Sequence, residues 1–349
     1  METLSIGQYF SRLADAFGKG WNRFWYLPSD PFPLCLMRIL VGIFSLCFIL
    51  SYTEDLSYFF TQGGLLPLEL TEQYPPFNAT YNPAVFSYFS YLHSPLELHI
   101  AHWIGIVILC LFTIGWHSRI TAVLGLFVIL SYIHRAPLIT SEIEPLLAAI
   151  QFYLCFGPCG ARLSVDRYLA KRKMPIMPQS EQDRGGKFFS ATLSTRLIQI
   201  HLCIIAAMMG IAKLSGPGEL TGGGEWVDPW GVGEAVWWMI ARPQTRVFEG
   251  LTSLRDYPYL IAAWTHIILL VELVFPILIW NRLVRPLVLA IAFVAWGSLI
   301  LISGIGPFYA LLIIGCISFF HPQFIEFWTS KLMRTKSSGQ LDPATSVQG

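Results

Sequence analysis

Residues 196–214 read RLIQIHLCIIAAMMGIAKL, an apolar run that opens with Arg196 and carries Lys213 next to its last position. A helix of about 20 apolar residues is long enough to cross the hydrocarbon core of a bilayer. The run therefore predicts a transmembrane helix with an amine near its far end. This segment indicates the fold class and also contains a side chain that can take part in chemistry.

The composition of the whole chain agrees with a membrane protein. Of its 349 residues, 54% are hydrophobic and 13% are charged, and the mean hydropathy is +0.55. Soluble domains carry about 25% charged residues, so the composition excludes an ordinary soluble globular fold. The formal net charge of +1 gives no reason to expect a nucleic-acid partner. The partner that the composition implies is the lipid bilayer.

Other apolar runs along the chain resemble the 196–214 segment. We expect an all-α polytopic membrane bundle of about eight transmembrane helices, filling residues 33–325. The third and eighth spans are short for a crossing helix. The predicted spans are 33–52, 96–116, 119–133, 142–159, 196–214, 258–280, 286–303 and 307–321.

Lysine and arginine are unevenly distributed between the loops, which predicts an orientation. The loop 53–95 contains neither residue, whereas residues 160–195 contain seven of them. Loops rich in lysine and arginine stay in the cytoplasm. The sequence therefore predicts a multi-pass protein with both termini cytoplasmic and with residues 53–95 and 215–257 outside.

The two flanks of the bundle differ in character. Residues 326–349 are expected to be a short polar cytoplasmic tail. Residues 1–32 read as an interfacial amphipathic segment that lies on the membrane, because apolar residues recur at helical spacing beside basic ones. An alternative is a simple N-terminal flank. The apolar positions are Leu4, Phe10, Leu13, Phe17, Trp21 and Phe24, and the basic ones are Arg12, Lys19 and Arg23.

Lys213 is the candidate catalytic residue. An amine near the hydrocarbon edge loses hydration, which favours its neutral form, and a neutral amine can accept a proton. The alternative is a lysine that extends its side chain to the headgroups and has no chemical role.

Four further residues are candidates for a substrate pocket around Lys213. Glu142 and Glu144 begin the fourth span, and His266 lies in the outer half of the sixth, so the predicted topology places them in the same outer layer. The two glutamates could instead be favoured by the helix dipole. Gln199 lies two seven-residue steps before Lys213, so the two share one helix face, which could line a cavity or pack against another helix.

Arg38 and Glu272 are candidates for a buried ion pair. Counted from the cytoplasmic boundary at 1.5 Å per residue, their depths are about 8 and 12 Å, a difference that an arginine side chain can span. The alternative is that Arg38 extends to the headgroups and Glu272 faces a cavity. No metal site is expected, because His99 and His102 have no acidic or cysteine residues at ligand spacing.

Five segments, in fixed order, carry a family resemblance. They are residues 30–42 (DPFPLCLMRILVG), 58–67 (YFFTQGGLLP), 157–166 (GPCGARLSVD), 196–214 and 272–280 (ELVFPILIW). Together they resemble the membrane domain of vitamin K-dependent gamma-carboxylase, also called the horizontally transferred transmembrane (HTTM) domain. The resemblance covers about residues 30–325.

The resemblance implies a role for Lys213. In the carboxylase, the corresponding lysine deprotonates reduced vitamin K, and the oxygenated quinol then acts as a strong base on a glutamate to which carbon dioxide adds. The cofactors implied here are reduced vitamin K or menaquinone, with O2 and CO2. The resemblance also implies that the site faces outward.

Two departures from the family pattern narrow the expected activity. Trp296 stands where the seventh span of the family has a histidine, and the sequence lacks the large extramembrane domain that binds the protein substrate. We therefore expect oxidation of a reduced quinone or action on another lipidic substrate, and do not expect protein-glutamate carboxylation. The alternative function is a non-catalytic membrane scaffold or a peptide-maturation or export factor, with a peptide or membrane-protein partner.

Overall fold

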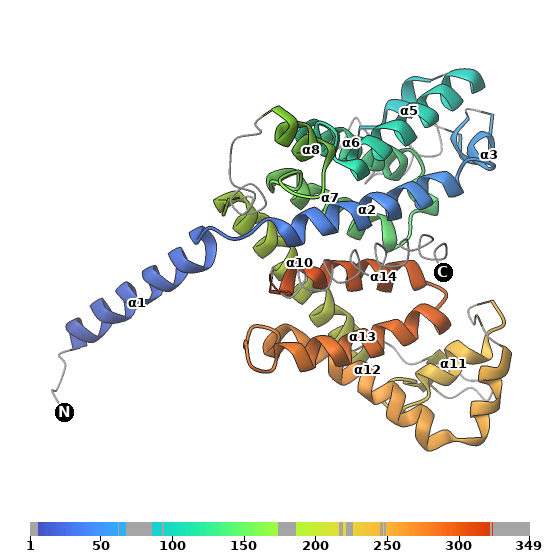
Figure 1. Cartoon of the computed structure of the whole chain (residues 1–349). Helices are drawn as coiled ribbons and strands as arrows, with labels where there is room; N and C mark the ends of the chain where they lie inside the picture. The colour runs from blue at the N-terminus through green and yellow to red at the C-terminus, as the bar shows by residue number, and fades with distance from the viewer. Residues whose placement is uncertain are drawn as a thin grey trace, which may run out of the picture.

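The chain folds as an all-α polytopic membrane bundle (Figure 1). This computed structural model describes residues 6–61, 63–67, 86–92, 94–173, 186–215, 219–220, 226–244, 247, 249–321 and 323. In this part of the chain, six helices are long and apolar enough to cross a membrane. They are α2 (Phe32–Ser51), α5 (Pro95–Ile114), α6 (Ser118–Arg135), α10 (Phe189–Ser215), α12 (Pro258–Leu278) and α13 (Arg285–Ile302).

Two shorter apolar helices occupy the remaining predicted spans. They are α7 (Ile143–Phe156) and α14 (Gly306–Gly315), and α14 continues as the 3₁₀ helix η5 (Cys316–Phe319). The third predicted span forms an 18-residue helix, whereas the fourth forms only 14 residues. The expectation that the third span is among the short ones is therefore wrong, because helix α6 continues through the polar residues His134 and Arg135.

The remaining elements are short, apart from α1 (Ile6–Tyr26). Residues Glu219–Leu220 (β1) and Trp226–Val227 (β2) form a two-residue antiparallel pair. The other α-helices are α3 (Leu56–Phe60), α8 (Val165–Lys173) and α11 (Ala235–Ala241). The other 3₁₀ helices are η2 (Tyr88–Tyr91), η3 (Pro137–Ile139) and η4 (Glu249–Asp256).

Local sequence signals explain where several helices begin and end. Helix α5 has a capping box, in which the Ser94 hydroxyl accepts a hydrogen bond from the backbone of Leu96 and the Glu97 carboxylate accepts one from the backbone of Ser94. Pro95 occupies the first position of the helix. It ends at Gly115, whose φ of +73° suits glycine. Prolines also open α12, α13 and α14, since a missing N–H costs nothing in the first turn.

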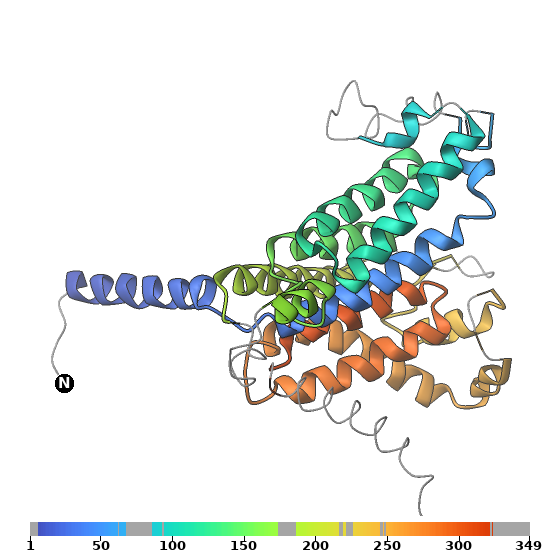
Figure 2. The same cartoon turned by 45° about the horizontal axis from the view of Figure 1, so that its top comes forward.

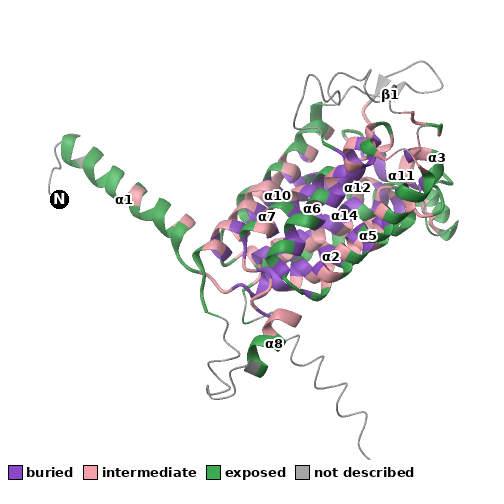
Figure 3. Cartoon of the chain, turned by 90° about the horizontal axis from the view of Figure 1, so that it is seen from above, coloured by how far each residue is buried: buried purple, intermediate pink, exposed green. Residues whose placement is uncertain are grey.

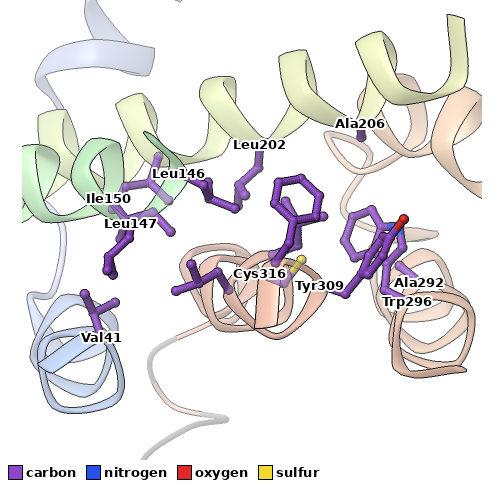
Figure 4. Packing of buried hydrophobic residues seen from close by; sticks show 14 of the residues in the cluster. Val41, Leu146, Leu147, Ile150, Leu202, Ala206, Ala292, Trp296, Tyr309 and Cys316 are labelled. Atoms are coloured by element: carbon purple, nitrogen blue, oxygen red, sulfur yellow. The ribbon is translucent and has the colours of Figure 1, made fainter. Parts of the chain in front are cut away.

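The bundle has two halves joined by α10. Helices α2, α5, α6 and α7 pack together, α12, α13 and α14 pack together, and α10 contacts both α7 and α12. Helix α14 lies at the centre, because it contacts α2, α7, α10 and α13. Figure 4 shows side chains of these helices converging there, among them Leu147, Leu202, Trp296 and Cys316.

Helix α1 projects away from the bundle (Figure 2), and Figure 3 shows its surface largely exposed. Its apolar side chains Phe10, Leu13, Phe17 and Trp21 are between 50% and 69% exposed. The end of α1 contacts the bundle, because Tyr26 stacks on Phe189 with ring centroids 5.2 Å apart. Just after the helix, the backbones of Ser29 and Phe188 exchange two hydrogen bonds. The predicted interfacial role of residues 1–32 stays a prediction, and the predicted tail 326–349 lies outside the described residues.

The bundle has two distinct ends. The α8 end carries the start of α2, the start of α10 and the turn from α12 to α13. The α11 end carries α3, the starts of α7 and α12, and the pair β1–β2. Under the predicted orientation, the α8 end is cytoplasmic.

Candidate functional site

An ion pair joins α10 to α12 at Lys213. Its ammonium Nζ donates hydrogen bonds to both carboxylate oxygens of Glu272. The side chain of Glu272 is fully buried, and that of Lys213 is 13% exposed. Lys213 therefore does not extend to the headgroups, because a carboxylate inside the bundle holds its amine.

Close helix packing brings the two residues together. Gly210 lies one turn before Lys213 and faces Leu273, next to Glu272. A Cβ atom at Gly210 would lie 2.8 Å from Leu273 Cδ2 and 3.2 Å from its backbone nitrogen. Small residues allow membrane helices to approach this closely. The glycine thus sets the separation across which the ion pair forms.

A cavity of about 390 Å³ opens beside this ion pair at the α11 end. It lies between the start of α7, the last turns of α10, the segment 228–230 and the start of α14. Its lining residues are Glu142, Met209, Ala212, Lys213, Asp228, Pro229, Trp230, Ile305, Phe308 and Tyr309.

Eight of the ten lining residues were not predicted from the sequence, and three of these eight carry a polar group. Trp230 lies with its ring centroid 4.4 Å from Lys213 Nζ, a cation–π contact. Asp228 accepts a hydrogen bond from the backbone of Trp230 at 3.0 Å. Tyr309 is 4% exposed and lies close enough to Glu272 and Glu142 to interact with both charges. A single hydroxyl in the apolar run 306–315 was a usable signal for Tyr309, since polar groups in membrane helices face the protein interior.

Of the two predicted glutamates, only one lines the Lys213 cavity in the structure. Glu142 lines the Lys213 cavity. Glu144 does not, because it accepts hydrogen bonds from the backbone and hydroxyl of Ser141 at 2.8 and 2.7 Å. It also accepts one from the Tyr52 hydroxyl at 3.4 Å. Glu144 therefore caps the start of α7, as the helix-dipole alternative anticipates.

The other two pocket candidates also lie outside the cavity lining. Gln199 donates to the carbonyl of Ser318 at 2.7 Å and accepts from Arg196 at 2.8 Å. Fourteen residues along a helix separate it from Lys213 by about 21 Å. His266 is exposed and contacts the carbonyl of Gly231 at 3.3 Å. Neither residue therefore lines the cavity with Lys213 in this structure.

The expected Arg38–Glu272 ion pair is not formed. Arg38 is fully buried, and its guanidinium donates to the carbonyls of Cys159, at 3.2 Å, and Leu163. Gly115 makes room for it, since a Cβ there would lie 2.0 Å from Arg38 Nη1. The prediction compared only the depth of the two residues in the membrane, which is similar. In the structure they lie in different halves of the bundle, Arg38 on α2 and Glu272 on α12.

No family model, curated protein or solved structure matches the chain. Among the described residues, no three histidine, cysteine, aspartate or glutamate side chains gather as a metal site would require.

Proposed function

We propose that the cavity binds a reduced quinone of the vitamin K type, or a similar lipid-soluble hydroxyl compound, and that Lys213 removes its proton. The observation that carries this proposal is the placement of Lys213, with a carboxylate partner, on the wall of a cavity between apolar helices. Such a cavity suits a ligand that arrives from the bilayer. The resemblance of residues 30–325 to the HTTM domain supports the same chemistry.

The Lys213–Glu272 ion pair can supply a neutral amine, which is a base, by moving one proton between its own two side chains. Transfer of one proton from the Lys213 ammonium to the Glu272 carboxylate leaves a neutral amine beside a neutral acid. The amine then takes the proton of a substrate hydroxyl, which becomes the anion while lysine becomes an ammonium again. The Trp230 ring would pack against the ring of the substrate. The Tyr309 hydroxyl would donate a hydrogen bond to the substrate oxygen.

A second function is favoured by the same ion pair. A buried lysine–glutamate pair also stabilises the contact between α10 and α12 without any reaction. It would then support a non-catalytic membrane scaffold, or a peptide-maturation or export partner, by holding these helices together. Removing one partner of a buried pair costs about 3–5 kcal/mol, whereas replacing both with apolar residues is often neutral. A double variant therefore separates the two functions.

The test uses purified full-length protein in lipid nanodiscs with reduced menaquinone or reduced vitamin K and O2. In this reaction, quinol and O2 give the quinone epoxide and water, which mass spectrometry detects. The variants are Lys213→Met, Glu272→Leu and the combination of both. Lys187→Met, which changes an exposed lysine just before α10, is the matched control.

We expect epoxide from wild type and from Lys187→Met, and at least about a hundredfold less from every variant that lacks Lys213, as for loss of a general base. The double variant should melt near the wild-type temperature and still be inactive. An active double variant would overturn the role of Lys213. Absence of both epoxide and quinone binding in wild type would overturn the enzyme proposal and direct attention to protein partners.

A further inference from the structure

Three arginines gather at the α8 end, away from the Lys213 cavity. Arg196 lies in α10, and Arg282 and Arg285 lie at the turn from α12 to α13. Arg196 and Arg285 both contact Trp280: the guanidinium carbon of Arg196 lies 5.9 Å from its ring centroid, and Arg285 Nη2 donates to its carbonyl at 3.5 Å. Arg282 lies two residues after Trp280, and its charge acts on both of the other arginines. Among the described residues, none of the three has a carboxylate partner. Like charges held together in this way require a counter-ion.

Two of these arginines are held in place by the protein itself. Arg196 donates to the carbonyl of Phe24 at 3.3 Å and to Gln199, and its guanidinium carbon lies 4.4 Å from the Phe24 ring centroid. Arg285 donates to the carbonyl of Ile279 at 2.9 Å. These bonds use backbone and amide oxygens, so they fix the guanidinium groups without neutralising them. Arg282 is exposed and makes no hydrogen bond to the described residues.

Exposed apolar side chains border the cluster. Leu283 and Leu287 are 87% and 62% exposed at the start of α13. On the other side, Phe24 contacts Trp280 with ring centroids 5.6 Å apart, where α1 leaves the bundle. A soluble anion would need the charges but not the apolar border, whereas a phospholipid uses both.

We propose that Arg196, Arg282 and Arg285 bind the phosphodiester group of one anionic phospholipid in the leaflet at the α8 end. Its acyl chains lie against Leu283 and Leu287, and its phosphate supplies the missing counter-charge. Basic pockets between membrane helices bind anionic headgroups in this way. The lipid would also support the junction of α1 with the bundle, because Arg196 holds the carbonyl of Phe24.

The test is native mass spectrometry of the full-length protein in detergent, titrated separately with phosphatidylglycerol and phosphatidylcholine. Arg282→Gln is the main variant, since an exposed side chain can be changed without disturbing the fold. Arg196→Gln probes the buried side of the site. Arg172→Gln, which removes an exposed charge from α8 at the same end, is the matched control.

Wild type and Arg172→Gln should retain one phosphatidylglycerol in preference to phosphatidylcholine. Arg282→Gln should bind it about fivefold more weakly, the effect of about one arginine near a membrane surface. Equal affinity of wild type and Arg282→Gln would overturn the proposal, as would an equal loss in Arg172→Gln. The melting temperature is also measured with inorganic phosphate and with phosphatidylglycerol. If both raise it equally, the ligand is a free phosphate group and the lipid proposal is overturned.

Discussion

At the scale of single residues, Asp166 connects the first turn of α8 to the start of α6. Its carboxylate accepts hydrogen bonds from the backbone of His117 at 2.8 Å, and from the backbone and hydroxyl of Ser118 at 2.8 and 2.9 Å. These are the first N–H groups of α6, so a residue distant in sequence caps the helix. Burial alone raises the pKa of Asp166, but the hydrogen bonds from Ser118 and His117 outweigh it and hold the pKa below its ordinary value.

This direction predicts how stability depends on pH. A carboxyl whose pKa is lower in the folded chain stabilises the fold at every pH above its unfolded value, about 4. That contribution is lost as the pH falls through the folded pKa. Asp166→Asn should therefore be less stable than wild type at pH 7, by about 1 kcal/mol for a lost cap, and the difference should shrink as the pH falls below about 4.

Melting temperatures in detergent from pH 7 to the lowest pH that the sample tolerates would measure this effect. Asp15→Asn on α1 is the control, because Asp15 is exposed and makes no such hydrogen bonds in the described residues. A difference between wild type and Asp166→Asn that stays constant at all pH values would contradict the ionised cap.

The partner of Glu272 could not be chosen from the sequence. Counting residues from predicted boundaries gives a position along each helix, and on that basis Arg38 was within reach. The choice of Lys213 depends on lateral packing, in which Gly210 lets α10 approach α12. That information is in the three-dimensional arrangement of helices, and a hydropathy pattern does not contain it. The pattern places Glu142 at a helix start, which is visible in the sequence, and in the structure this residue lines the cavity with Lys213; its role in binding a substrate stays a prediction.

At the scale of elements, the contact between α10 and α12 positions the catalytic candidates. Gly210→Val would place two methyl groups where Leu273 now packs. Overpacking of this kind costs about 1–3 kcal/mol. It would also widen the gap that the Lys213–Glu272 pair spans, so we expect a lower melting temperature together with weaker quinone binding.

Gly297→Val on α13 is the matched control for this prediction. A Cβ atom at Gly297 meets nothing within 4 Å, so the same change should leave the melting temperature nearly unaltered. If Gly210→Val melts like Gly297→Val, then α10 and α12 are not packed through this glycine.

Helix ends show where sequence patterns stop being informative. The predicted fifth span begins at Arg196, but α10 begins seven residues earlier, at Phe189. Polar residues such as Ser194 and Thr192 hide this extension from a hydropathy reading, yet both are buried, and Ser194 donates to the carbonyl of Tyr153 at 2.7 Å. Tertiary contacts therefore lengthen the helix beyond its apolar core.

At the scale of the whole molecule, the two ends have different chemistry. The α8 end holds the arginine cluster and the Asp166 cap, and the α11 end holds the cavity with Lys213, Glu142 and Asp228. The uneven distribution of lysine and arginine predicts that the α8 end is cytoplasmic. The orientation determines from which side of the membrane a water-soluble co-substrate or peptide reaches the cavity.

Cysteine labelling in intact cells tests this orientation. Tyr91, in η2, and Tyr168, in α8, are 68% and 57% exposed at opposite ends of the bundle. A membrane-impermeant maleimide should label Tyr91→Cys in intact cells, and should label Tyr168→Cys only after permeabilisation. The wild-type chain, with its free cysteines at seven positions, sets the background. The reverse pattern would invert the topology, and the Lys213 cavity would then open toward the cytoplasm.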